Sequence, residues 1–294
     1  MGEKFEFARD RLMANFFWSV GMSPSDPRFG YFRRMTTKIA SLITVIDDVY
    51  DVYGTLDELE LFTDAVERWD IDALDMLPCY LKICFTTLHN TINDVAFDIL
   101  EDQGVNVIQY LRKVWVDLCK TFLTEAKWYY TNYKPTFQEY LDNAWISVSG
   151  PLLLVHAYVF TTKSITTEDL EGLEDYPDLI RYSSMIFRLS NDLASSSDEA
   201  ERGEVANSLQ CYMNDTDASE HEARTHIEGL IVESWKKINQ VQNMSSSPYF
   251  SRTLIEIASN LARIAHTVYQ HRDGHTVEDH ETRDGVLSLF INPI

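Results

Sequence analysis

The stretch ITVIDDVYDVYG, Ile43 to Gly54, places three aspartates directly after an apolar run. On a helix, Asp47 and Asp51 are four residues apart and share a face, whereas Asp48 lies about 100° round the axis. Like charges at this spacing repel each other, and Asp is a poor helix former, so local stability does not explain the cluster. A divalent cation explains it, because a hard cation takes oxygen ligands and turns carboxylate repulsion into shared coordination.

Length and charge limit the classes of function that fit the chain. Its 294 residues can form one large domain, and neither a Gly, Ser or Pro-rich linker nor a repeat divides them, so we expect a single domain over residues 1–294. The net charge of −21 argues against nucleic acid or an anionic membrane surface as a partner. No apolar run is expected to reach the length of a membrane span.

The cysteines and the N-terminus give two further expectations. The four cysteines have neither zinc-type spacing nor the density of a disulfide framework, so we expect reduced, buried thiols at Cys79, Cys84, Cys119 and Cys211. The first residues, MGEKFEFARD, resemble neither a signal peptide nor a transit peptide. They begin inside a helical pattern, as in a shortened chain.

Apolar residues recur at helical spacing in almost every segment between turn signals, and no stretch alternates with a period of two. We therefore predict an all-α domain, with the helix from Leu56 capped by Asp57 and Glu60. The predicted helices are Lys4–Val20, Arg33–Tyr53, Leu56–Arg68, Pro78–Gln103, Asn106–Asn132, Thr136–Val148, Pro151–Thr161, Thr166–Asp175, Pro177–Glu201, Ser219–Gln242, Tyr249–Gln270 and Thr276–Leu289.

A second group of oxygen ligands follows about 140 residues later in IFRLSNDLASSSDEAERGE, residues 186–204. Asn191, Ser195 and Glu199 recur every four residues and form one stripe of amide, hydroxyl and carboxylate oxygens, all of which can bind magnesium. Arg188 lies one turn before Asn191, where it can reach an anion held by that metal. The alternative is an ordinary solvated, Ser-rich helix surface.

Together these motifs resemble the catalytic domain of plant class I terpene synthases, in the monoterpene synthase group. DDVYD matches the family's DDxxD motif, and NDLASSSDE matches its (N/D)Dxx(S/T)xxxE motif. Chain-elongating prenyltransferases carry a second DDxxD instead, so the resemblance favours a cyclising or eliminating lyase. It implies the class I terpenoid synthase helical bundle, here without the family's first helices and without its N-terminal helical domain.

The resemblance also implies a metal and a substrate. Three Mg²⁺ ions, for which Mn²⁺ can substitute, would bind the diphosphate of a prenyl diphosphate. Two would be held by Asp47 and Asp51, with Asp48 acting through its neighbours. The third would be held by Asn191, Ser195 and Glu199.

Further elements of the family match this chain. ARDR, Ala8 to Arg11, is similar to the RxR element, so Arg9 and Arg11 would join Arg188 in stabilising the departing diphosphate. ISVSGP, Ile146 to Pro151, resembles the helix break beside the active site. Tyr269 and Asp273 match positions at the lid over the metals, where His275 replaces a Tyr found in some relatives.

The expected cavity for the carbocation is dry and apolar, because water would quench the cation. Trp18 matches an aromatic position on that cavity, and ordinary core packing is the alternative role. Isoprene synthases have a Phe seven residues before the first aspartate, where this chain has Ala40, although Phe187 resembles their other aromatic residue. We favour geranyl diphosphate as substrate, with dimethylallyl diphosphate as the alternative.

The remaining expectations concern the protein as a whole. A different class of function, a non-catalytic helical scaffold descended from the fold, stays open. By resemblance the protein would act in the plastid, on a small-molecule substrate, as a monomer or weak dimer. The other histidines, including the apolar-face residues His156 and His266, are expected to be core or surface residues and not bases.

Overall fold

The computed structural model describes residues 11–202, 206–243 and 250–269. Every regular element within these ranges is a helix, as predicted. Three short segments are not α-helical, namely η1 (Pro27–Phe29), η2 (Val49–Tyr53) and η3 (Ile71–Met76). The α-helices are α1 (Leu12–Met22), α2 (Gly30–Asp48), α3 (Leu56–Arg68), α4 (Cys79–Gln103), α5 (Ile108–Thr131), α6 (Phe137–Ser147), α7 (Gly150–Thr161), α8 (Thr167–Glu174), α9 (Asp178–Arg202), α10 (Ser208–Thr216), α11 (Glu220–Asn243) and α12 (Arg252–Val268).

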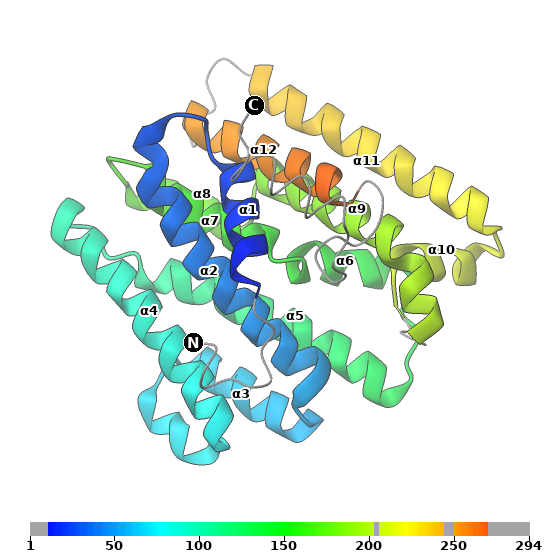
Figure 1. Cartoon of the computed structure of the whole chain (residues 1–294), viewed down its shortest axis with the longest axis horizontal. Coiled ribbons are helices and arrows are strands. Elements are labelled where there is room, and N and C mark those ends of the chain that lie inside the picture. Colours follow the sequence, from blue (N-terminus) through cyan, green and yellow to red (C-terminus); the bar gives the residue numbers. More distant parts are fainter. Residues whose placement is uncertain (1–10, 203–205, 244–249, 270–294) are drawn as a thin grey trace.

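Helix α7 lies at the centre of the bundle (Figure 1). Its residues from Gly150 to Val159 are all buried, because the segment is apolar on every face and has no side to present to water. Helices α2, α5, α9 and α12 pack against it, and α1 fills the angle between α2 and α12. Helix α11 packs along α9, while α3 and α4 pack on α5.

The apolar run through α6 and α7 is longer than the sequence analysis expected. Phe137–Thr161 spans 25 residues with a mean hydropathy of 1.4, so by length and composition it could cross a membrane. The expectation that no run reaches that length is therefore wrong. Within the bundle, 83% of the apolar window is buried, as in the core helix of a globular domain.

The helix break predicted at ISVSGP separates α6 from α7. Ser149 adopts the left-handed conformation with φ of 68°, and α7 restarts at Gly150 with Pro151 in its first turn. Gly150 is needed because α9 passes very close to it. A Cβ at this position would overlap the Ser184 hydroxyl and come within 3.0 Å of Ser184 Cα.

The end of α2 changes its winding at the aspartates. After Asp48 the backbone forms the π-helical segment η2, closed by a hydrogen bond of 2.8 Å from the Gly54 N–H to the Val49 carbonyl. Single π-helical turns of this kind are frequent at functional sites. The first and last aspartates of DDVYD therefore lie on differently wound backbone.

The predicted helices agree closely with those observed. Two corrections concern helices, and a third concerns the exposure of a cysteine. Helix α10 was not predicted, because its residues are mostly polar; Asn207 caps it by accepting a hydrogen bond from the Gln210 N–H. The capping box of α3 is formed by Thr55 and Glu58, two residues earlier than the predicted Asp57 and Glu60. Cys79 is exposed, whereas the other three cysteines are buried as expected. The predicted helix Thr276–Leu289 lies outside the described residues.

Candidate active site

The three aspartates lie at the carboxyl end of α2 and on η2. Asp47 is half-buried, Asp48 is only 1% exposed, and Asp51 is exposed. Burying carboxylates side by side is unfavourable unless a positive charge compensates them. The buried carboxylates therefore need positive charge nearby.

The charges around Asp47 come from four separate parts of the chain. Burial is the largest cause of its raised pKa, about 6, and the carboxylates of Asp48 and Glu125 add to it. The guanidinium groups of Arg188 and Arg11 act in the opposite direction. Residues that are far apart in sequence thus lie within electrostatic reach of one aspartate.

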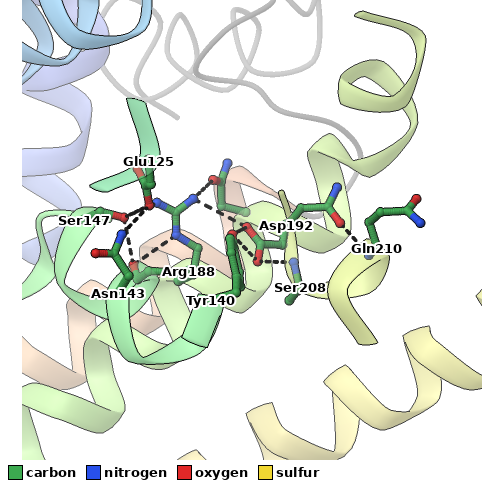
Figure 2. A network of polar contacts seen from close by, with 11 residues as sticks. Glu125, Tyr140, Asn143, Ser147, Arg188, Asp192, Ser208 and Gln210 are labelled. Carbon is green, nitrogen blue, oxygen red and sulfur yellow. Dashed lines mark hydrogen bonds and ion pairs between the residues drawn. The ribbon is translucent and has the colours of Figure 1, made fainter. Parts of the chain in front are cut away.

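Arg188 is held in place by the end of α6 (Figure 2). Its Nε donates to the Ala144 carbonyl at 3.1 Å, and its Nη2 donates to the Ser147 hydroxyl at 3.0 Å. Its Nη1 lies 3.4 Å from the Asn191 amide oxygen, the contact expected one turn apart on a helix. The guanidinium is therefore oriented before any ligand binds.

Glu125, on α5, is a site residue that the sequence analysis missed. Its carboxylate accepts hydrogen bonds from Ser147 Oγ at 2.6 Å and Asn143 Nδ2 at 3.0 Å. It thereby links α5 to the residue that orients Arg188. No motif surrounds Glu125 in the sequence, so only the packing of α5 on α6 brings it into the site.

Asp192 anchors the same network from within α9 and was also assigned no role from the sequence. It is 1% exposed, and Tyr140 Oη lies 3.0 and 2.9 Å from its two carboxylate oxygens. The Ser208 N–H donates to it at 3.1 Å, and Arg188 lies 3.5 Å away. Burial raises the pKa of Asp192, while Arg188 and the hydrogen bonds oppose that shift. Asp192 thus ties the start of α10 to α9 and α6 (Figure 2).

The predicted stripe on α9 fits a metal ion in its described part. Asn191 is half-buried with its amide oxygen toward Arg188. Ser195 is 2% exposed, and its buried hydroxyl has no hydrogen-bond partner in the described part of the protein. An orphaned buried hydroxyl one turn from an amide oxygen suits an oxygen-seeking cation. Glu199 falls on α9, but its side chain is outside the described residues.

The acidic residues alone do not form a closed metal site. Among the described residues, no three His, Cys, Asp or Glu side chains are grouped so that they could hold a metal. The two predicted ligand sets also include amide and hydroxyl oxygens. Such oxygen donors are the ligands that a hard cation such as Mg²⁺ prefers.

A cavity of about 440 Å³, partly open to solvent, begins one turn from these charged residues. Ile43 and Thr44 on its wall lie just before Asp47, and Phe187 lies just before Arg188. The complete lining is Asn15, Trp18, Ser19, Met22, Thr36, Ala40, Ile43, Thr44, Ser149, Leu153, Phe187 and Tyr269. The lining is mixed, because five of these twelve residues are Asn, Ser or Thr, so the cavity is less uniformly apolar than expected.

Four residues singled out from the sequence meet on this cavity. The ring centroids of Trp18 and Phe187 are 4.8 Å apart, and Tyr269 lies 5.9 Å from Trp18 and 6.3 Å from Phe187. Ala40, the fourth, lines the same cavity from α2. Because alanine is small, the space that a larger side chain at position 40 would fill is left to the cavity.

The other predicted site residues divide into two groups. Arg11 is described and acts electrostatically on Asp47, whereas Arg9, Asp273 and His275 lie outside the described residues.

His156 lies on α7, where it is 1% exposed and its Nδ1 lies 2.8 Å from the Leu152 carbonyl. Burial lowers the pKa of His156 to about 4, so it is neutral at pH 7. His266 is exposed on α12.

Comparison with known proteins gives a consistent family. A model described as "Terpene synthase family, metal binding domain" matches residues 1–237. "Terpene synthase 10" of Ricinus communis is 59% identical over 294 residues, covering 100% of this chain and 53% of that protein. "(-)-alpha-terpineol synthase" of Vitis vinifera is 57% identical, covering 100% and 49%. "Myrcene synthase, chloroplastic" of Quercus ilex is 58% identical, covering 99% and 48%. The chain spans about half the length of these relatives.

Solved structures agree with the sequence comparison. Isoprene synthase from grey poplar leaves, in complex with three Mg²⁺ ions and dimethylallyl-S-thiolodiphosphate, has a TM-score of 0.93 and 50% identity, covering 99% of this chain and 55% of that one. Limonene synthase with 2-fluorolinalyl diphosphate has a TM-score of 0.95 and 45% identity, covering 99% and 53%. The helical bundle is therefore shared with both proteins over nearly the whole of this chain.

Proposed function

Because this chain belongs to the terpene synthase family, whose metal-binding domain it contains, we propose that it converts geranyl diphosphate into a monoterpene and inorganic diphosphate. The single observation that carries the proposal is that Arg188 and Arg11 act electrostatically on Asp47, close in sequence to Thr44 and Phe187 on the wall of the cavity. A charged site for a diphosphate next to a mainly apolar cavity matches the two ends of a prenyl diphosphate.

The proposed cofactor is Mg²⁺, with Mn²⁺ as a substitute. The residues that would hold it are Asp47, Asp51, Asn191, Ser195 and Glu199. Bound there, the metal would act as a Lewis acid on the leaving diphosphate. The three Mg²⁺ ions in the poplar isoprene synthase structure support this choice of cofactor.

The chain's own residues would stabilise and orient the leaving group. Arg188, fixed by Ala144 and Ser147, would donate charge-assisted hydrogen bonds to the diphosphate, together with Arg9 and Arg11. Because that guanidinium is already oriented, little reorganisation is needed as negative charge develops on the leaving oxygen. Tyr269 and Asp273 would cover the charged site.

The aromatic side of the cavity would guide the cation after ionisation. Trp18 is 7% exposed and borders the cavity, so its ring face can stabilise positive charge by a cation–π interaction. Phe187 and Tyr269 extend the same aromatic surface. Leu153 and Ile43 on the remaining wall limit the access of bulk water.

A second candidate activity is the elimination of dimethylallyl diphosphate to isoprene. Phe187 on the cavity wall favours it, because an aromatic residue there shortens the space for a prenyl chain. Ala40 favours the ten-carbon substrate, because the opposite wall is open.

Product analysis tests the proposal. Purified protein with Mg²⁺ is incubated separately with geranyl and dimethylallyl diphosphate, and the volatile products are identified by gas chromatography and mass spectrometry, with excess EDTA as the control. Monoterpene formation that EDTA abolishes supports the proposal. A preference for dimethylallyl diphosphate would favour the isoprene alternative, and no turnover of either would favour a non-catalytic scaffold.

Two broader proposals accompany this function. The described helices share one hydrophobic core, which supports a single catalytic domain over residues 1–294. Relatives named chloroplastic support a location in the plastid.

A further inference from the structure

Helix α1 lies alongside α2 (Figure 1), and polar side chains join the two at regular intervals. Each pair lies four residues further along α2 and four residues further back along the chain at α1, so the two helices are antiparallel and their register is constant. We call these pairs the polar ladder. They are Ser23 with Arg33, Ser19 with Thr37, and Asn15 with Ser41, at 3.1, 3.0 and 3.3 Å between their polar atoms.

The α1 side of the polar ladder is buried. Asn15 is 3% exposed and Ser19 is fully buried, while Thr37 opposite them is 8% exposed. Apolar contacts are not directional, so they hold two helices together without fixing sharply where one lies along the other. Buried polar pairs are directional, and pairs of this kind specify the register of packed helices. The polar ladder therefore fixes the axial position of α1 on α2.

The hydroxyls of the polar ladder also bond within their own helices. Thr37 and Ser41 each bond to the carbonyl four residues earlier, at 2.7 and 2.9 Å. Ser19 Oγ likewise donates to the Asn15 carbonyl at 2.8 Å. A hydroxyl that loses its partner on the other helix thus keeps a hydrogen bond, so the fold should tolerate removal of a pair better than the register does.

This register brings the start of α1 to the charged site. Arg11 lies one turn before Asn15, so the next position of the polar ladder on α2 is Val45. Val45 precedes Asp47 by two residues, about 3 Å along the axis. The electrostatic effect of Arg11 on Asp47 agrees with this placement.

A change of register would move Arg11 away from that site. One turn of a helix is about 5.4 Å, which is longer than any hydrogen bond. Thr37 and Ser41 lie outside the lining of the cavity, so a substrate held there would not touch them. Any effect of these two residues on a bound diphosphate would have to pass through α1.

We propose that Thr37 and Ser41 are positioning residues, which fix α1 along α2 so that Arg11 reaches the diphosphate beside Asp47. This inference rests on the proposed function. It differs from a role in folding, because it predicts that loss of the two hydroxyls weakens diphosphate binding only while Arg11 is present.

The test measures the binding of inorganic diphosphate in the presence of Mg²⁺ by calorimetric titration, with turnover of geranyl diphosphate and Tm recorded for each protein. The ladder variant combines Thr37→Val with Ser41→Ala, and each substitution is also measured alone. The rescue variant combines Thr37→Ser with Ser41→Thr and keeps both hydroxyls. Ser234→Ala is the matched control, because Ser234 is 3% exposed on α11, lies outside the cavity lining and bonds to the Leu230 carbonyl at 2.8 Å.

We expect the ladder variant to bind diphosphate roughly tenfold more weakly, the factor that one hydrogen bond to a charged group is worth. Each single substitution should have a smaller effect in the same direction. The rescue variant and Ser234→Ala should match the parent. In an Arg11→Ala background, the ladder substitutions should weaken binding no further, because the residue that they position is gone.

An unchanged Kd for diphosphate in the ladder variant would overturn this inference. An equal loss in Ser234→Ala, or a further tenfold loss in the Arg11→Ala background, would also overturn it. A parent that binds diphosphate with Mg²⁺ but does not turn over geranyl diphosphate would overturn the proposed function, while the comparison of Kd values would still decide the role of the polar ladder. A parent that binds no diphosphate would overturn both.

Discussion

Replacing Asp47 by Asn should stabilise the metal-free protein while it removes most of the activity. Burial and the carboxylates of Asp48 and Glu125 raise the pKa of Asp47 to about 6 from its ordinary value of 3.8. The folded state binds this proton more tightly than the unfolded state. The contribution of Asp47 to the free energy of unfolding is therefore most favourable below pH 3.8 and is lost as the pH rises through 6. Asn cannot ionise, so the variant escapes this loss.

The magnitude follows from the two pKa values. At 1.36 kcal/mol per pH unit, ionised Asp47 lowers the free energy of unfolding by up to about 3 kcal/mol at pH 8. At pH 4 this destabilisation is under about 1 kcal/mol, because Asp47 is largely protonated in the folded protein. For a protein of this size, 3 kcal/mol corresponds to a rise in Tm of roughly 6–12 °C.

Thermal unfolding in EDTA at pH 4 and pH 8 measures this difference, with Asp94→Asn as the control because Asp94 is exposed in the middle of α4. Adding Mg²⁺ and inorganic diphosphate should raise the Tm of the parent much more than that of Asp47→Asn. Turnover of geranyl diphosphate should fall sharply in the variant, since one lost ligand misplaces the leaving group. A variant no more stable than the parent at pH 8, or equally stabilised at both pH values, would refute the charge-crowding argument. Full activity in the variant would refute the metal site.

Three further substitutions test other parts of the site. Glu199→Ala should shift the Mg²⁺ titration to higher concentration and lower the rate, and an unchanged titration would mean that this stripe is only a solvated surface. Ala40→Phe should raise kcat/KM for dimethylallyl diphosphate relative to that for geranyl diphosphate, because the ring fills part of the cavity that Phe187 also lines. An unchanged ratio of the two kcat/KM values would place position 40 outside the substrate's path. Tyr140→Phe removes the hydrogen bonds to buried Asp192 and should lower the free energy of unfolding, measured by urea titration, by about 1.5–3 kcal/mol. An unchanged free energy of unfolding would show that the carboxylate finds another donor.

The helices were largely predictable because each one carries its own apolar period. Leu56–Arg68 agrees with α3 at both ends, since the turn before it and the left-handed residue after it are local signals. Helix α10 was missed because its short polar sequence depends on Asn207 as a cap and on Asp192 as an anchor. That anchor comes from another helix, so no local pattern contains it.

The same distinction between local signals and contacts from other helices explains which site residues could be recognised in the sequence. The two motifs proposed to bind metal each have a fixed local spacing, so they could be recognised in the sequence, and their role as ligands stays a prediction. Glu125 and Tyr140 carry no motif, and they enter the site only because α5 and α6 pack beside α9.

The close crossing of α7 and α9 at Gly150 has a consequence for protein engineering. Leu153, one turn after Gly150, and Phe187, one turn after Ser184, lie on the walls that these two helices contribute to the cavity. A larger residue at position 150 would have to displace Ser184 or separate the helices, because a Cβ there would overlap Ser184 Oγ and lie 2.7 Å from Ser184 Cβ. We therefore expect position 150 to set the width of the cavity without contributing a side chain to it, and under the proposed function we expect a library that varies this position to change the mixture of products.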